Sequence, residues 1–109
     1  MKDCVFCRIV CGEIPSQIVY RDKRCFAIHD IKPTAPLHLL IIPQRHITSL
    51  ESSEGMAGHL LAVASKLAIR EGVDRTGYRL VVNYGPDSGQ EVAHLHVHLL
   101  AGRRMFSMG

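Results

Sequence analysis

His94, His96 and His98 stand at every second position near the end of the chain and have the clearest capacity for chemistry in this sequence. In a β-strand, alternate side chains share one face and lie about 6.6–7 Å apart, so the three imidazoles would form a row while Leu95 and Val97 face the core. An imidazole titrates near pH ~6.5, so it can attack an electrophile, orient a neighbour or move a proton at neutral pH. The pattern therefore predicts a functional face on this strand.

Three interpretations of the histidine row follow from the residues alone. The imidazoles could lie on a solvent-exposed outer face without a function. Two of them, with His38 from another predicted strand, could hold a catalytic zinc ion. Alternatively, one imidazole attacks the substrate as a covalent nucleophile while its neighbours orient it and transfer protons. The strict spacing disfavours the first interpretation and leaves the other two open.

The composition suits a domain that handles a small anionic substrate. Thirteen Lys and Arg residues stand against ten Asp and Glu, a net charge of +3, and Trp is absent. A nucleic-acid-binding protein usually shows a basic stripe with aromatic platforms, so that class is disfavoured. The longest apolar stretch, residues 39–43, is too short to span a membrane, and no signal peptide is recognisable. We therefore expect a cytoplasmic protein whose cysteines form no disulfide framework.

Periodicity and turn residues predict a single α+β domain spanning residues 1–109. One long helix, residues 54–71, has apolar side chains at helical spacing, with Ser52 or Ser53 as its N-cap and Gly72 at its C-terminal end. The remaining elements are a short helix at 5–11, strands at 18–20, 25–28, 38–42, 78–83 and 95–100, and a turn at 84–90. This order indicates an antiparallel sheet with the helices packed on one face.

The segment 94–100, His-Leu-His-Val-His-Leu-Leu, resembles the His-apolar-His-apolar-His-apolar-apolar motif that names the histidine triad (HIT) superfamily. Flanking segments agree in order along nearly the whole chain, at residues 6–10, 13–15, 29–31, 35–36, 42–43, 46–47, 77–79, 83 and 89–92. The sequence is most similar to the branch of histidine triad nucleotide-binding proteins, whose known activity is hydrolysis of purine nucleoside phosphoramidates. The resemblance implies a HIT-like fold, a five-stranded antiparallel sheet with one long and one short helix.

The resemblance implies a role for each histidine. His96 attacks the α-phosphorus and forms a nucleotidyl-histidine intermediate, which water then cleaves. His98 donates hydrogen bonds to phosphate oxygens and passes a proton to the leaving group, while His38 and His94 support and orient the site. We expect a main-chain carbonyl on an adjacent strand to hold the proton on the far nitrogen of His96. No cofactor is expected to take part in catalysis.

The resemblance also implies a pocket for a purine nucleotide. Asp30 is expected to accept hydrogen bonds from both ribose hydroxyls, although an Asp just before Lys32 and Pro33 is also typical of a turn. The loop 85–92 is expected to supply main-chain N–H groups to the phosphate. Glu91 is expected to contribute through its N–H, because its carboxylate would repel the phosphate. The expected nucleotide-binding residues are Phe6, Ile9, Ile14, Ile28, His29, Asp30, Ile31, Leu40, Asn83, Gly89, Gln90, Glu91, Val92, His96 and His98.

Cys4 and Cys7 have the two-residue spacing of a zinc half-site. Some histidine triad proteins hold a structural zinc with residues of this kind, and by that resemblance His46 and His94 complete a Cys2His2 ligand set. Such a metal would tie the N-terminal helix to the histidine segment and stabilise a small domain.

The resemblance further implies a homodimer formed through the long helix and an edge strand. Residues 78–83 lack the alternation expected of a strand with one solvated face, which supports a covered edge. Within the same chemistry, a dinucleoside polyphosphate hydrolase is an alternative activity. A nucleotide-binding regulatory module with negligible turnover is an alternative of another class. Neither nucleic acid nor a membrane is an expected partner.

Overall fold

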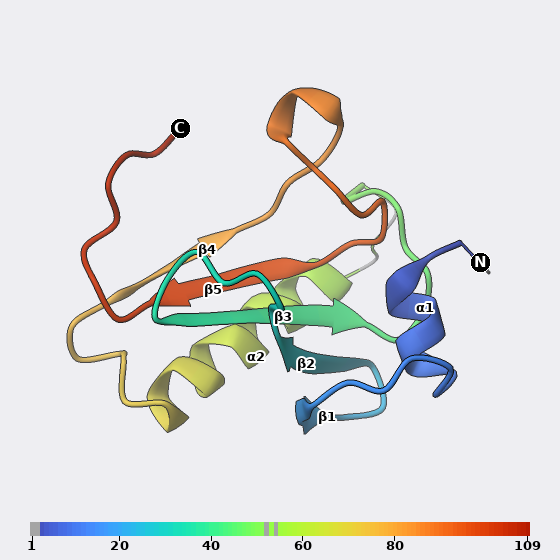
Figure 1. Ribbon diagram of the computed structural model, residues 1–109, viewed down its shortest axis with the longest axis horizontal. Coiled ribbons are helices and arrows are strands. Elements are labelled where there is room, and N and C mark those ends of the chain that lie inside the picture. The colour runs from blue at the N-terminus through green and yellow to red at the C-terminus, as the bar shows by residue number, and fades with distance from the viewer. Residues whose placement is uncertain (1–2, 52, 54) are drawn as a thin grey trace.

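One five-stranded antiparallel sheet forms the centre of the structure, a computed structural model that describes residues 3–51, 53 and 55–109 (Figure 1). The strands are β1 (Ile18–Arg21), β2 (Cys25–His29), β3 (Leu37–Pro43), β4 (Tyr78–Val81) and β5 (Val97–Ala101), in the order β1-β2-β3-β5-β4. The helices are α1 (Val5–Val10), α2 (Met56–Arg70) and a short 3-10 helix, η1 (Pro86–Ser88). This α+β architecture is the predicted one. Among the described residues, no helix is long and apolar enough to cross a membrane.

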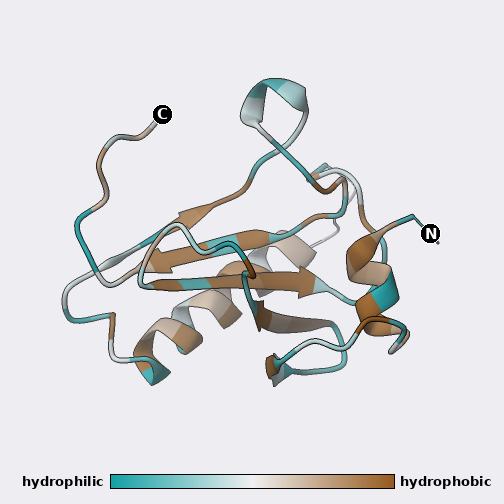
Figure 2. Cartoon of the chain, in the orientation of Figure 1, coloured by the Kyte–Doolittle hydropathy of each residue, from teal (hydrophilic) through white to brown (hydrophobic). Residues whose placement is uncertain are grey.

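β3 lies in the middle of the sheet and separates two hydrophobic cores. It pairs with β2 on one side and β5 on the other, and it is buried on both faces, which accounts for its nearly continuous apolar run (Figure 2). Leu39 and Ile41 pack in the core that α2 covers, whereas Leu40 and Ile42 pack with Phe6 of α1. The prediction that the helices share one face is therefore wrong, because both faces of the central strand are apolar and each needs a cover.

α2 presents the apolar face that the sequence predicts. Its buried residues are Met56, Leu60, Val63, Ala64, Leu67 and Ala68. It ends as predicted, since Gly72 follows the cap with a φ of +75°, which glycine adopts without strain. At its start, the predicted positions Ser52 and Glu54 lie outside the described residues, and Gly55 takes the N-cap place with no side-chain hydrogen bond. Ser53 contributes only its carbonyl oxygen, which accepts from the first helical N–H.

A carboxylate in the turn between β1 and β2 fastens this hairpin to α2. Asp22 accepts hydrogen bonds from the N–H groups of Arg24 and Cys25, each at 2.7 Å, and from the Tyr20 hydroxyl at 2.8 Å, and it lies 2.9 Å from His59 of α2. Burial alone would raise the pKa of Asp22, but these hydrogen bonds together hold that pKa well below its usual range. Both carboxylate oxygens are thus occupied in stabilising the fold.

β5 begins at Val97, later than the predicted residue 95, and this changes the arrangement of the histidines. In the register of β3 and β5, Ile41 lies opposite Val97, so Leu95 would lie opposite Pro43. Pro43 has no N–H to donate, and the N–H of Leu95 bonds instead to the carbonyl of Ile47 at 2.6 Å. Leu95 and Val97 are buried on the α2 side as predicted, but only the last of the three histidines lies in the strand.

Candidate active site

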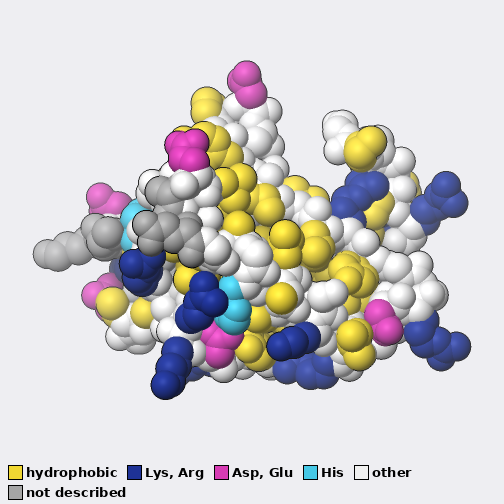
Figure 3. Space-filling view, turned by 180° about the vertical axis from the view of Figure 1, so that it is seen from behind, with side chains coloured by type: hydrophobic (Ala, Val, Ile, Leu, Met, Phe, Trp, Pro, Cys, Tyr) yellow, Lys and Arg dark blue, Asp and Glu magenta, His cyan; other side chains and the backbone are white. Residues whose placement is uncertain are grey.

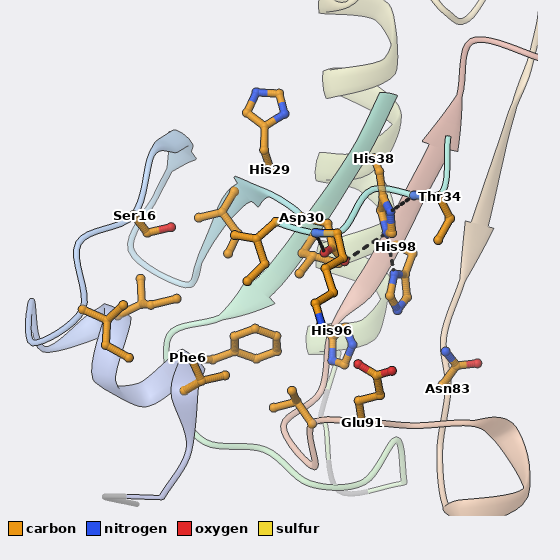
Figure 4. Close-up of a pocket in the computed structure, with 18 of the residues that line it drawn as sticks. Phe6, Ser16, His29, Asp30, Thr34, His38, Asn83, Glu91, His96 and His98 are labelled. Atoms are coloured by element: carbon orange, nitrogen blue, oxygen red, sulfur yellow. Dashed lines mark hydrogen bonds and ion pairs between the residues drawn. The ribbon is translucent and has the colours of Figure 1, made fainter. Parts of the chain in front are cut away.

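His96 is buried at the inner wall of a pocket, and its imidazole is held in one tautomer (Figure 4). Its Nδ1 lies 2.7 Å from the carbonyl oxygen of His94, a distance at which Nδ1–H donates a hydrogen bond. The proton is therefore held on Nδ1, and the lone pair of Nε2 is available for attack. The accepting carbonyl belongs to the residue two positions earlier, not to an adjacent strand as predicted. The Phe6 ring stands edge-on to this imidazole, with 5.1 Å between centroids.

A directed chain of hydrogen bonds runs from the main chain to His98. The N–H of Thr34 donates to Nδ1 of His38 at 3.1 Å, which places the ring proton of His38 on Nε2. That Nε2–H faces Nδ1 of His98 at 2.9 Å, so His98 carries its own proton on Nε2. The rings of His96 and His98 lie 4.9 Å apart, centroid to centroid. A main-chain amide thus sets two tautomers in succession and leaves an N–H donor beside the nucleophilic nitrogen.

The turn that follows β5 holds Thr34 in place. Gly102 has a φ of +98°, and a Cβ at this position would lie 2.7 Å from the Cβ of Pro36, so only glycine fits. This close approach lets the next residue, Arg103, donate to the carbonyl of Thr34 at 2.7 Å. Thr34 is therefore held at both its carbonyl, which accepts from Arg103, and its N–H, which donates to His38.

Burial favours the neutral forms of these imidazoles. Burial, together with the neighbouring His96 and His38, lowers the pKa of His98 from 6.5 to about 4. Burial is also the main cause that lowers the pKa of His94 to about 4. The pKa of His38 is lowered by burial as well, against the opposing attraction of Asp30. Neutral rings agree with the tautomers that the hydrogen bonds define.

Asp30 takes part in a turn and in the pocket at the same time. Its Oδ1 accepts the N–H of Lys32 at 2.8 Å, the turn role that the sequence left open. Its Oδ2 lies 3.4 Å from Nε2 of His38, and the residue lines the pocket. The turn fixes the carboxylate at the rim, so the two sequence interpretations are compatible.

The pocket has a volume of about 550 Å³, within the range typical of small-molecule sites, and has an apolar and a polar end (Figure 4). Phe6 lies at the apolar end, whereas Asn83, Glu91 and the paired imidazoles lie at the other. The predicted residues that line it are Phe6, Ile9, Ile14, Ile28, His29, Asp30, Ile31, His38, Leu40, Asn83, Gly89, Glu91, Val92, His96 and His98. The geometry thus brings together nearly all of the predicted nucleotide-binding set.

Two predicted site residues lie elsewhere. Gln90 is not among the lining residues, and its Oε1 accepts the N–H of Gly85 at 3.0 Å, which closes the loop on itself. His94 is fully buried behind the pocket. The sequence interpretation in turn missed lining residues, namely Val5, Pro15, Ser16, Lys32 and Thr34. The charge of Lys32 beside Asp30 was a usable signal, whereas Thr34 acts through its main-chain N–H, which no side-chain pattern reveals.

The loop before the triad has few N–H groups left for an anion. Those of Gly85, Ser88, Gly89 and Gln90 are used inside the loop. Within the described parts of the chain, no acceptor faces the N–H of Glu91 or of the residue after it. We therefore expect the N–H groups of residues 91 and 92, and not those of the whole loop, to contact the phosphate.

Cys4, Cys7, His46 and His94 converge on one point, as the resemblance implied. Nδ1 of His94 lies 3.2 Å from Sγ of Cys4 and 3.6 Å from Sγ of Cys7, and Nδ1 of His46 lies 3.2 Å from both Sγ of Cys7 and Nδ1 of His94. Tetrahedral zinc with ordinary Zn–S and Zn–N bonds separates its ligand atoms by about 3.3–3.8 Å. Nε2–H of His94 donates to the carbonyl of Pro43 at 3.0 Å, which turns the lone pair of Nδ1 toward the thiols. The donor set therefore fits a zinc ion.

The other candidate metal groups fit less well. His38 and His98 meet in a direct 2.9 Å hydrogen bond, so the two ring nitrogens that face each other have no free lone pair for a catalytic metal, and Asp30 is the one remaining ligand of this set. The interpretation of the triad as three exposed histidines is wrong, because His94 is 0% and His96 only 6% exposed. The arrangement favours the covalent interpretation of the triad.

The structure combines a five-stranded antiparallel sheet with three clustered histidines. Two of them are adjacent in the pocket with defined tautomers, and the third is buried behind them. This combination is typical of a histidine triad protein. The chain belongs to this family, since the model of the HIT domain matches residues 11–105.

Relatives of known structure or activity agree with this assignment. The chain is 42% identical to the purine nucleoside phosphoramidase of Escherichia coli K12 over 98% of this chain and 93% of the relative. It is similar to the structure of a histidine triad protein from Clostridium difficile, with a TM-score of 0.93, 42% identity, and coverage of 100% and 98% of the two chains. A zinc-bound histidine triad family protein from Mycobacterium smegmatis has a TM-score of 0.83 at 32% identity, over 94% and 76%.

Proposed function

We propose that the protein is a purine nucleoside phosphoramidase that acts through a covalent intermediate on His96. The observation that carries the proposal is the 2.7 Å hydrogen bond from Nδ1–H of His96 to the carbonyl of His94, which leaves Nε2 as a free nucleophile. Nε2 attacks the α-phosphorus and forms a P–N bond. The bond from phosphorus to the leaving amine breaks, and its electron pair goes to that amine. The similarity to a purine nucleoside phosphoramidase supports this choice of reaction.

His98 acts as the general acid in the first step and as the general base in the second. In the free protein it is neutral at pH 7, because burial lowers its pKa to about 4. The negative charge of a bound phosphoryl group stabilises the imidazolium, so in the complex His98 takes up a proton on Nδ1, in place of the hydrogen bond from His38, and passes its Nε2 proton to the departing amine. In the second step the neutral ring takes a proton from the attacking water. The P–N bond to His96 then breaks, and its electron pair returns to Nε2.

The two ends of the pocket suit the parts of a purine nucleotide. The pocket residues support this assignment: the apolar side chains around Phe6 suit the base, and the carboxylate of Asp30 suits the ribose hydroxyls. The phosphoryl group then lies against His96 and His98. Lys32 at the same rim brings a positive charge that suits phosphate oxygens.

The test is the intermediate itself. Rapid acid quench of the protein with adenosine phosphoramidate, followed by intact mass spectrometry, is expected to show one adenylyl group on the wild type and none on His96→Gly. The variant should lose roughly 10³-fold or more in kcat. It should still bind the nucleotide product in calorimetry, because the base slot and Asp30 are intact. Full turnover by the variant would contradict the covalent mechanism.

We also propose that Cys4, Cys7, His46 and His94 bind a structural zinc ion. The convergence of their ligand atoms supports this, as does the zinc-bound relative. The ion would fix the start of α1, whose Phe6 contacts the rings of both His94 and His96. A site that needs reduced thiols agrees with the expected cytoplasmic location, which stays a prediction.

We propose in addition that two copies pair through α2 and the edge strand β4. All four β4 residues are half-buried, so neither face of this strand is fully solvated. Leu61 and Ile69 are exposed, and their spacing puts them on one face of α2 with Ser65 between them. The Ser65 hydroxyl lies 2.8 Å from that of Tyr78, so this face borders the edge strand. Hydrophobic side chains run as a band across the side of the molecule behind the sheet (Figure 3), a surface suited to a second copy.

A further inference from the structure

Glu91 is a charged pocket residue that the phosphoryl chemistry leaves unexplained. It is exposed, and its carboxylate points into the pocket beside His96, on the side away from Phe6 (Figure 4). Within the residues that the structure describes, Glu91 has no ion pair and no side-chain hydrogen bond. A carboxylate at this place repels a phosphate, so its charge must serve another part of the substrate or weaken binding.

The remaining parts of the pocket show which part of the substrate meets Glu91. The apolar end around Phe6 suits the base, and Asp30 at the rim is already engaged by Lys32 and His38. The phosphoryl group lies at His96. The side with Glu91 is left for the fourth component, the group that departs from phosphorus. The phosphoryl charge has a complement in Lys32, whereas the Glu91 charge has none in the free protein.

We propose that Glu91 is a specificity-determining residue that selects phosphoramidates whose leaving amine carries a positive charge on its distal part. This inference rests on the proposed function and extends it to the class of leaving group. An ammonium group on the amine side chain neutralises Glu91 and removes its repulsion of the phosphate. Reaction at phosphorus is unchanged, because Glu91 exchanges no proton and forms no bond.

The test compares three adenosine phosphoramidates with the same linear alkylamine, which ends in a methyl, an ammonium or a carboxylate group. The wild type is expected to prefer the ammonium over the methyl substrate by about three- to tenfold in kcat/KM, the size of a partly solvated charge pair. Glu91→Gln should bring this ratio close to one, and Glu91→Lys should favour the carboxylate. High salt should weaken the wild-type preference. Glu71→Gln removes the same charge at the end of α2 and should retain the preference.

The outcomes separate this inference from the proposed function. Turnover of all three substrates without a charge preference, or a preference that persists in Glu91→Gln, overturns the role of Glu91 alone. No turnover and no adduct with any of the three removes the proposed function, and this inference with it. Binding of the nucleotide product by Glu91→Gln that is at least as tight as by the wild type shows that the pocket is intact, because the variant lacks the repulsion of the phosphate.

Discussion

The partly buried position of His98 predicts a specific dependence of stability on pH. Its pKa falls from 6.5 to about 4 on folding, chiefly through burial. Because the folded pKa lies below the unfolded one, protons bind first to the unfolded chain. The contribution of neutral His98 to stability is therefore present above pH 6.5 and is lost progressively as the pH falls toward 4.

The size of the effect follows from the two pKa values. Between pH 7.5 and pH 5, proton uptake by the unfolded chain at this one site lowers the free energy of unfolding by about 2 kcal/mol. With an ordinary urea dependence for a small domain, this corresponds to a midpoint shift of about 1–2 M urea. The lowered pKa values of His94 and His38 add losses of the same sign, so the total acid sensitivity of the wild type does not isolate His98.

A difference measurement separates the contribution of His98 and its partner His38 from that of the remaining groups. Urea unfolding of the wild type and of His98→Gln is recorded at both pH values, with the metal content checked in each sample. The titration of His94 is common to both proteins and cancels in the comparison, whereas His38 is hydrogen-bonded to His98, so the difference reports on this pair of rings. The wild type should lose about 2 kcal/mol more than the variant on acidification. Equal losses would refute the argument that His98 is held neutral by burial.

The zinc and dimer proposals have equally direct tests. Metal analysis should find one zinc per chain in protein purified without chelators and none in Cys4→Ser/Cys7→Ser, with Tm lowered by at least about 10 °C, whereas Cys11→Ser, at an exposed thiol, should match the wild type. Zinc-free wild type would end this proposal. Sedimentation equilibrium should give about twice the chain mass of 12.1 kDa, and Leu61→Glu/Ile69→Glu should give the monomer. A monomeric wild type at micromolar concentration would remove the dimer.

Elements with a strong period or a long apolar run were predictable from the sequence. The buried face of α2 contains every apolar residue that the helical spacing indicates, and β3 is the fully buried strand that its composition indicates. The start of β5 was not predictable from its own residues. It depends on the register that brings Pro43, a residue without an N–H, opposite residue 95. The prediction that both helices pack on one face was wrong for a related reason, since the sequence does not show that both faces of the sheet are covered.

The residue types that carry the chemistry of the site were predictable, but the hydrogen bonds that orient them were not. The histidine spacing and the resemblance together indicated His96 and His98, and the pocket contains both. The tautomers depend on Thr34, whose contribution is a main-chain N–H and leaves no trace in the side-chain pattern. The loop 85–92 was predicted to give several N–H groups, yet most of them bond within the loop, because its glycines allow a tight turn.

His94 performs two tasks through different atoms, and this affects how mutagenesis of the triad is to be interpreted. Its carbonyl holds the proton of His96, while its ring faces Cys4 and Cys7. Alanine scanning removes only side chains. Any activity lost in His94→Ala therefore reports on the ring that faces the metal site and says nothing of the carbonyl. The service to the nucleophile would remain, since every residue type carries a carbonyl. A backbone ester between His94 and Leu95 leaves the His94 ring in place but weakens the His94 carbonyl as an acceptor, and so separates the two tasks; it also removes the Leu95 N–H that bonds to Ile47.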